Sequence, residues 1–413
     1  MMGRYRWVIC AFLFAATTLN YLDRFTISFL KPTLSGEFHW SEIDYANIVG
    51  WFTLAYAIGY VVFGRLIDKL GARLGYSIAV VIWTCAHVSC AFVSSLVGFS
   101  AMQFGLGLGQ SGNFPAALKA VAEWFPQRER ALANGIFNAG SNIGAILTPL
   151  IVPIIVLTFG WRMAFVATGS LSLIWLILWV AVYRRPQEHP KVKPLELAYI
   201  ESDQQVLEKP VPWLKLFPVR ETWAYALGKF LTDPVWWFYL FWLPDFFHKK
   251  YGLDLKSFGP PIIVIYILSD VGSVAGGWMS STMIQSGASV NAARKLTMLI
   301  CALCVLPVMF VMFISNEWAA VAIIGLATAA HQAFSANLLT IPSDTMPRAA
   351  VASVVGIGGT AGAAGGWLMA KATGVVLQIT QSYALIFIGM ATMYLVALVV
   401  IHWLSPRLAP AKF

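Results

Sequence analysis

The stretch Asn20-Tyr21-Leu22-Asp23-Arg24 places a carboxylic acid and a guanidinium side by side in an apolar run from about Trp7 to about Leu30. A helix rises ~1.5 Å per residue, so about 20 apolar residues cross the ~30 Å core of a bilayer, and this run is long enough to span one. A charged side chain at that depth costs at least ~2.5–3.5 kcal/mol. The pair therefore indicates either a structural ion pair between helices or a site for an anion and a proton.

The composition of the 413-residue chain is that of a membrane protein with many spans. Hydrophobic residues make up 59% of the chain and charged residues 11%, against about 25% charged residues in soluble domains. Such a chain could not cover itself with polar surface in water. Its net charge of +9 would suggest nucleic-acid binding in a soluble protein, but here the positive-inside rule explains it. We therefore expect a lipid bilayer, and not nucleic acid, around this chain.

Neither the cysteines nor the N-terminus indicates a redox site or a cleavable signal peptide. The five cysteines all lie in apolar segments. Cys301 and Cys304 have redox-motif spacing, but their run lacks His or Asp neighbours, so we interpret them as packing residues. Arg4 and Arg6 precede a segment too long for the apolar core of a cleavable signal peptide, so we expect the first helix to be retained.

Twelve apolar segments predict an all-α integral membrane protein with two six-helix halves. We predict the first half over residues 1–185, a cytoplasmic linker over 186–220 and the second half over 221–413. The linker is charged and rich in proline, so it cannot be one continuous helix, although Leu195–Leu207 can form a short surface helix. Lysine and arginine gather in the loops after even-numbered spans and in the linker, with a local exception at Lys249, Lys250 and Lys256. This bias predicts that both termini are cytoplasmic.

The connection after the second span reads Gly64-Arg65-Leu66-Ile67-Asp68-Lys69-Leu70-Gly71-Ala72-Arg73. Gly64 and Gly71 allow a tight turn and close helix approach, and Asp68 can pair with neighbouring cations; Arg73 ends the motif. We expect these four residues to have a structural or gating role. The second half keeps a weaker version, Gly276-Gly277-Trp278 followed by Gly287 and then Arg294-Lys295. This recurrence indicates an internal repeat.

These features resemble the Major Facilitator Superfamily, whose signature loop is similar to Gly64–Arg73. Asn20–Arg24 resembles the first-helix motif of its anion:cation symporter family, which contains bacterial galactonate, glucarate and hexuronate transporters. Further motifs, distributed over essentially the whole chain, resemble the hexuronate branch. They are Glu123-Trp124-Phe125-Pro126 with Glu129-Arg130, Phe137–Ala145, Phe230–Pro234, Lys250–Lys256 and Ala330–Ser335.

The resemblance implies two bundles that rock around a central cavity and carry an anionic sugar acid with protons, most directly a hexuronate such as galacturonate or glucuronate. It implies a bacterial inner-membrane protein, which we expect to be a monomer. The nearest alternative is another organic anion such as galactonate, glucarate or an aromatic acid. A sensor that binds without translocating is a second alternative, although the long hydrophilic sensory domain is missing. No His-rich metal cluster, nucleophile elbow or nucleotide loop occurs in the sequence, so we expect no enzyme activity, no metal and no cofactor.

Arg24 is the candidate for binding the substrate carboxylate, and the resemblance implies the same role. Its planar guanidinium accepts a carboxylate bidentately and stays charged at any cellular pH. Adjacent helix residues do not face each other, so Arg24 should do more than neutralise Asp23. A carboxyl balanced between burial and a nearby cation can bind and release a proton near neutral pH. The resemblance ties Asp23 to this proton coupling.

Sugar recognition requires neutral donors and acceptors together with an aromatic face. Each polar residue in a span is, taken alone, more often a helix-packing contact than a ligand, but as a set they predict a binding site. The first half supplies Tyr21, Tyr56, Asn138, Ser141 and Asn142, and the second supplies Trp236, Trp237, Tyr239, His331, Gln332, Ser335, Asn337 and Thr360. For His331 we favour a hydrogen-bonded structural role over a proton relay. Lys229 and Asp233, four residues apart, can pair locally or contact a group across the cavity.

The fourth span departs from the family pattern. Family members carry a glutamate before a small-residue stretch that contains proline, with an arginine seven residues earlier. Here Gln110 and Gln103 take those positions, two turns apart on one helix face. In the family the glutamate is a second protonation site, and glutamine mimics its protonated form without releasing a proton. We expect impaired proton-coupled uptake with binding or exchange retained, whether the pair is an engineered change or belongs to a natural homologue.

Overall fold

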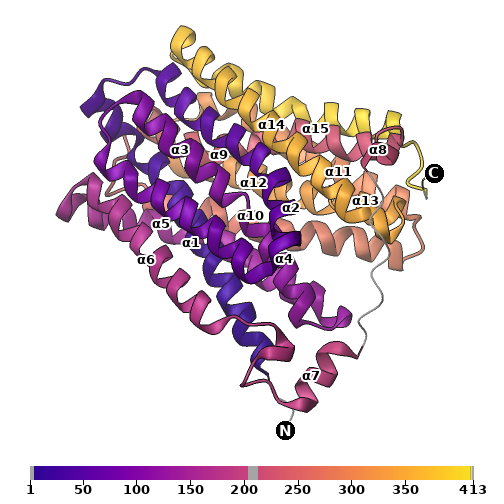
Figure 1. Cartoon of the computed structure of the whole chain (residues 1–413). Helices are drawn as coiled ribbons and strands as arrows, with labels where there is room; N and C mark the ends of the chain where they lie inside the picture. The colour runs from indigo at the N-terminus through magenta and orange to yellow at the C-terminus, as the bar shows by residue number, and fades with distance from the viewer. Residues whose placement is uncertain (1–3, 203–212, 410, 412–413) are drawn as a thin grey trace. The chain divides into compact units, whose positions relative to one another are not determined.

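The computed structural model of the chain describes residues 4–202, 213–409 and 411, and it is all-helical (Figure 1). No strand occurs in those ranges. Helices follow from the apolar runs because a bilayer offers backbone groups no water to bond, so each span must satisfy its own hydrogen bonds. The predicted fold class is confirmed.

The chain divides into two compact units, and the first comprises Met1–Thr33 and Trp51–Val206. Its helices include α1 (Tyr5–Phe38), most of α2 (Glu42–Ser89), η1 (Cys90–Phe92), α3 (Leu96–Gln110), α4 (Asn113–Trp124), α5 (Gln127–Phe159) and α6 (Trp161–Val182). The second unit comprises Leu34–Gly50 and Leu207–Phe413. Its helices include α9 (Arg220–Tyr251), α10 (Gly259–Gln285), α11 (Val290–Val305), η3 (Leu306–Phe313), α12 (Glu317–Leu338), α13 (Ile341–Thr345), α14 (Arg348–Thr380) and α15 (Ala384–Leu404). The predicted boundaries at residues 185 and 220 stay predictions.

Within the described residues, eight helical segments are long and apolar enough to cross a membrane, so this is a multi-pass membrane protein. One of them, Glu42–Phe92, holds both the second and the third predicted span. The fourth, seventh and eleventh predicted spans are not among the eight. They correspond to α3 with α4, which are separate short helices, to the aromatic α9 and to the glycine-rich α14.

The turn between the second and third spans is a kink at one glycine. Helix α2 continues through Gly64, and only Gly71 leaves the helical backbone, with φ +78°. Residues that have a side chain rarely adopt this backbone conformation, so glycine is favoured there. The expected loop over Gly64–Arg73 is therefore wrong in extent. Beyond the kink, Arg73 Nη2 donates to the Val180 carbonyl at 2.6 Å, and Asp68 lies 3.8 Å from Lys119 in an exposed contact.

The fourth span, predicted as one helix, is broken at Ser111 and Gly112 into α3 and α4. The Ser111 hydroxyl donates to the Leu108 carbonyl at 2.6 Å, which satisfies a carbonyl near the end of α3. A Cβ at Gly107 would collide with the backbone of Phe52. Glycine at this position is what allows α3 to touch α2.

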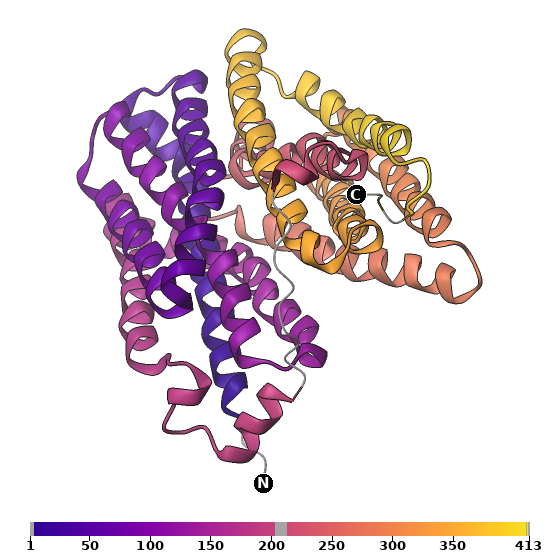
Figure 2. The ribbon, with the colours of Figure 1, turned by 45° about the vertical axis from the view of Figure 1, so that its right-hand side comes forward.

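The linker contains η2 (Pro186–Glu188), α7 (Pro194–Glu201) and α8 (Trp213–Leu216). Helix α7 lies beside the N-terminal end of the chain within the first unit (Figures 1 and 2), whereas α8 belongs to the second unit, where it contacts α14. Arg6 Nε donates to Glu129 at 2.8 Å, and Arg6 Nη1 donates to Glu196 at 3.3 Å. The Tyr199 hydroxyl also donates to Glu129, at 2.8 Å. The predicted helix over Leu195–Leu207 overlaps α7, and its residues 203–207 lie outside the described residues.

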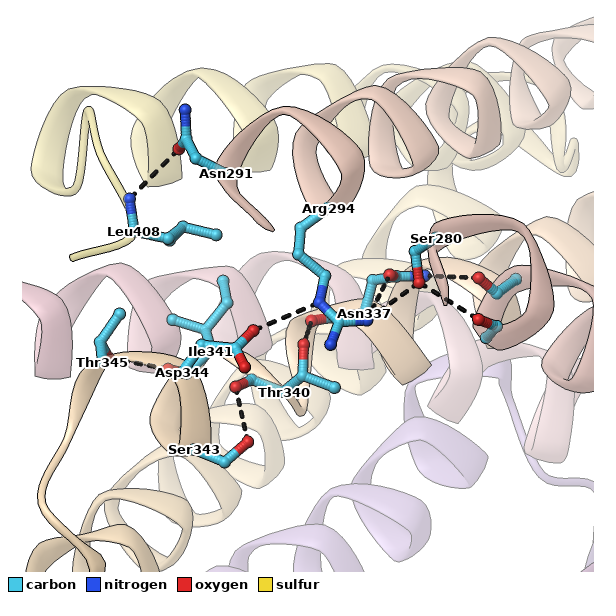
Figure 3. A network of polar contacts seen from close by, with 12 residues as sticks. Ser280, Asn291, Arg294, Asn337, Thr340, Ile341, Ser343, Asp344, Thr345 and Leu408 are labelled. Carbon is cyan, nitrogen blue, oxygen red and sulfur yellow. Dashed lines mark hydrogen bonds and ion pairs between the residues drawn. The ribbon is translucent and has the colours of Figure 1, made fainter. Parts of the chain in front are cut away.

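In the second unit, Arg294 of α11 lies at the centre of a polar network (Figure 3). Its Nε donates to Asp344 at 3.2 Å, and its Nη1 donates to Ser280 at 2.9 Å and to Asn337 at 3.4 Å. Gly287, with φ +96°, forms the turn between α10 and α11. A glycine with positive φ therefore stands between the second and third helices of each half, as an internal repeat requires.

Segment Leu34–Gly50 contacts α9 and α14 within the second unit. The Tyr45 hydroxyl donates to the Phe241 carbonyl at 2.8 Å. Lys249 pairs with Glu42, and its Nζ lies 3.2 Å from Asp245. These contacts, and not sequence order, place this segment in the second unit.

Candidate functional site

Arg24 is buried in α1, with 2% of its surface exposed. Its Nε donates to Oε1 of Gln110 at 3.0 Å, and its Nη2 donates to Oδ1 of Asn20 at 2.9 Å. Gln110 Nε2 donates in turn to the Asn20 carbonyl at 2.8 Å. This second bond fixes the amide so that its oxygen faces the guanidinium.

Three aromatic rings surround the same guanidinium. Arg24 Cζ lies 4.5 Å from the ring centroid of Tyr21, 4.9 Å from that of Tyr56 and 5.5 Å from that of Phe52. Each distance is within cation–π range. Tyr21 and Tyr56 are among the predicted binding residues, whereas Phe52 is not. Its place one turn before Tyr56 on α2 was the available signal.

Asp23 contacts a different set of residues, from α2 and α6. Ser172 Oγ donates to its Oδ2 at 2.8 Å, and its Oδ1 lies 3.3 Å from Nε2 of His87. The same His87 nitrogen lies 2.7 Å from Thr168 Oγ1. Sequence reasoning missed all three partners. His87, a histidine inside a predicted span, was the signal available.

Helix α5 touches α1 at glycines that lie next to its predicted polar residues. A Cβ at Gly144 would collide with the Thr18 carbonyl and with Tyr21 Cβ, so the two helices touch there. Ser141 Oγ donates to the Asn138 carbonyl at 2.7 Å and lies 3.5 Å from Oδ1 of Asn142, in the turn before Gly144. The structure thus places Ser141 and Asn142 within the turn before the contact with Tyr21, whereas Asn138 lies further from it along α5 and is exposed.

Gln103 is buried but does not reach the arginine. It is 1% exposed, and its amide contacts Cys90 Sγ at 3.8 Å. Gln103 and Gln110 therefore have different partners, and only Gln110 bonds to Arg24.

In the second unit, two of the predicted residues stack. The rings of Trp236 and His331 lie 5.3 Å apart at an interplanar angle of 4°. His331 Nδ1 lies 2.7 Å from the Tyr394 hydroxyl, and Tyr266 meets Trp236 edge-on at 6.0 Å. This cluster combines an aromatic face with polar ring atoms, a combination suited to a sugar.

The other second-unit candidates are more dispersed. Lys229 pairs locally with Asp233 at 2.8 Å. Trp237 stacks on Phe241 at 6.1 Å, and the buried Tyr239 hydroxyl has no hydrogen bond among the described residues. Ser335 is buried, Gln332 is half-buried, and Thr360 donates to the Gly356 carbonyl at 3.1 Å. Asn337 belongs to the Arg294 network and does not join the Trp236 cluster.

A cavity of ≈ 330 Å³ lies elsewhere in the second unit, among α9, α14 and α15. Its lining is apolar, with Phe230, Leu368 and Met390 among the contributors. None of the predicted binding residues lines it. A charged sugar would lose its hydration there without gaining partners, so this cavity does not suit such a ligand.

Repeated sets of membrane-spanning helices, with a buried arginine and acid in one of them, are typical of integral membrane transporters. The chain belongs to the Major Facilitator Superfamily, whose sequence profile matches residues 13–370. This family consists of membrane transporters and not of enzymes, so the predicted class is confirmed.

Among known proteins, the chain is similar to the hexuronate transporter of Escherichia coli (strain K12). The two are 30% identical over 413 residues, which cover 98% of this chain and 95% of that protein. It is 32% identical over 324 residues to the galacturonate transporter of Dickeya chrysanthemi, with 77% and 94% covered. Among solved structures, a D-xylose-proton symporter has a similar fold, with a TM-score of 0.77 at 15% identity over 98% of this chain and 99% of that one.

Proposed function

We propose that this chain transports anionic sugar acids, most directly hexuronates such as galacturonate and glucuronate, with protons and by alternating access. The two relatives named above, a hexuronate and a galacturonate transporter, support the substrate class. The fold shared with a D-xylose-proton symporter is compatible with proton coupling.

The observation that carries the proposal is the surroundings of Arg24. The guanidinium lies within a membrane span, where an ionised group is expensive and usually functional. Gln110 and Asn20 accept hydrogen bonds from it, and both acceptors are neutral amide oxygens. A substrate carboxylate that replaced one of these amides would convert a neutral hydrogen bond into a charge-assisted one.

The remaining groups fit the rest of a sugar acid. Tyr21 and Tyr56 offer hydroxyl groups and ring faces beside the guanidinium. Asn138, Ser141 and Asn142 offer amide and hydroxyl groups on the neighbouring helix. We propose that Asp23, which has its own partners on α6, carries the proton.

Counterflow of labelled galacturonate in proteoliposomes tests this function. We expect exchange by the unaltered chain, loss of it in Arg24→Gln, and retention of it in Arg162→Gln, an exposed arginine at the start of α6. Unlabelled galactonate, glucarate and an aromatic acid serve as competitors that identify the preferred anion. Binding without counterflow would instead indicate a sensor, and full exchange by Arg24→Gln would refute the proposed site.

We also propose a bacterial inner-membrane location with both termini in the cytoplasm, and a monomeric state. The lysine and arginine bias supports this orientation. Reporter fusions at the two ends test the orientation, and light scattering of the purified protein tests the monomer.

A further inference from the structure

Asp23 and His87 form a buried acid–imidazole pair inside the first unit. They are 1% and 0% exposed, and Asp23 Oδ1 lies 3.3 Å from His87 Nε2. Asp23 Oδ1 has no hydrogen bond, and neither does His87 Nδ1, within the part of the chain that the structure describes. Two buried polar atoms are therefore unsatisfied in one small cluster, which a purely structural pair would avoid.

The hydrogen bonds of α6 constrain the hydrogens of this pair. Thr168 Oγ1 can donate its single hydrogen to the Ala164 carbonyl at 2.9 Å, and it then accepts from His87 Nε2 at 2.7 Å. In that arrangement Nε2 carries a hydrogen that also faces Asp23 Oδ1, whereas an Nε2 without a hydrogen can accept one from the Asp23 acid. Ser172 donates to the other carboxylate oxygen, Oδ2, and leaves Oδ1 for the imidazole.

We propose that Asp23 and His87 together form the proton-binding site of this transporter, with one exchangeable proton shared between Oδ1 and the imidazole. This inference rests on the proposed proton symport and adds His87, Thr168 and Ser172 to it. The proton can reside as a carboxylic acid beside a neutral imidazole or as a carboxylate beside an imidazolium. Both forms of the pair are neutral, whereas loss of the shared proton leaves a charge of −1.

The charge balance with Arg24 links this proton to the substrate. With neither proton nor substrate bound, the negative charge of the Asp23 carboxylate offsets the positive charge of Arg24, the next residue in the sequence. With both, the pair is neutral and the substrate carboxylate balances Arg24. A site holding only one of the two carries a net charge inside the membrane, which is costly. Substrate and proton should therefore bind together and be released together.

The groups packed around the pair bring few competing charges. From α1 comes Arg24, the residue after Asp23, which bonds to Gln110. Helix α2 contributes Trp83 beside Asp23, and α6 contributes Thr168, Ser172 and the edge-on ring of Phe165. No other acid or histidine contacts the pair among the described residues. Proton binding should then reflect Asp23 and His87 alone, and it should not require an acid at position 110.

The test compares the unaltered chain with His87→Gln and with a matched control, His402→Gln, which changes an exposed histidine at the end of α15. Three quantities are measured: counterflow of galacturonate, accumulation driven by a pH gradient, and the number of protons taken up per galacturonate bound. Calorimetry in two buffers with different heats of ionisation gives the third. We expect His87→Gln to keep counterflow but to lose gradient-driven accumulation and proton uptake. His402→Gln should match the unaltered chain in all three.

Ser172→Ala provides a second variant if His87→Gln does not fold. Removal of the hydroxyl takes away a donor to the carboxylate, so the pH midpoint of proton uptake should move upward while transport persists. Coupling retained unchanged in both variants would overturn the role of His87 and leave sugar-acid/proton symport intact. Counterflow without proton uptake in the unaltered chain would instead overturn the proposed symport, and this inference with it.

Discussion

Oε1 of Gln110 accepts a 3.0 Å hydrogen bond from Nε of Arg24, across 86 residues of sequence. The family resemblance implies a glutamate at the position of Gln110. A carboxylate at this distance would form an ion pair with Arg24 and compete with the substrate. A neutral amide keeps the geometry and removes the competition.

Gln110→Glu should therefore weaken galacturonate binding at high pH and restore it at low pH, where the new acid is protonated. A charge-assisted hydrogen bond contributes about 1.5–3 kcal/mol, which corresponds to a loss of about 10–100-fold. Calorimetric titration across a pH series measures the galacturonate affinity. In the same variant, accumulation driven by a pH gradient should depend more steeply on pH. Gln110→Met, which has similar length and no charge, is the control. An equal loss at every pH in Gln110→Glu would contradict the ion-pair explanation.

Trp236→Leu should weaken sugar-acid binding by about 3–10-fold, because an aromatic stack contributes about 0.5–1.5 kcal/mol. Trp236 stacks on His331, so Trp236→Phe should lose less. Competition for counterflow measures the affinities. Trp318→Leu, at a residue of α12 that is 48% exposed, is the matched control. Equal losses in Trp236→Leu and Trp318→Leu would mean that the Trp236 cluster does not bind substrate.

Glu196→Ala should lower the thermal stability of the purified protein. Glu196 is fully buried and accepts hydrogen bonds from both the backbone and the guanidinium of Arg6. Removal of one partner of a buried pair costs about 3–5 kcal/mol, and Glu129 should offset part of that by keeping its own bond to Arg6. Unfolding of the detergent-solubilised protein measures the change. Glu188→Ala, an exposed glutamate of the same linker, should have almost no effect, and similar losses in both variants would show that the Arg6 contact is not responsible.

A double-mutant cycle on Glu42 and Lys249 tests how Leu34–Gly50 is held in the second unit. The two side chains form an ion pair that is partly exposed, and Lys249 also contacts Asp245. Exposed pairs contribute about 0.2–1 kcal/mol, so Glu42→Ala and Lys249→Ala should show a coupling energy in that range. Chemical unfolding in micelles provides the four free energies. Strictly additive effects would mean that the pair contributes nothing to this packing.

Part of the site was readable in the sequence because its signals are local. Tyr21, Asp23 and Arg24 stand out as polar and charged residues within one apolar run, and burial of the latter two agrees with that reading. Gln110 was noticed only as a departure from a pattern. Its bond to Arg24 could not be inferred, because it depends on how α3 is rotated against α1. The break at Ser111 and the single-residue kink at Gly71 likewise depend on packing against α2 and α6.

The sequence by itself determined that this chain crosses a membrane many times, belongs to a transporter family and buries an arginine in its first span. Run length, composition and charge placement along the chain carry that information, and a bilayer leaves an apolar run no alternative to the helix. Only the tertiary structure decided the partners of those charges. His87, Thr168 and Ser172 come from helices far along the chain, with Ser172 lying 149 residues after Asp23. Such partners are set by helix rotation and register, which residue spacing within one helix does not encode.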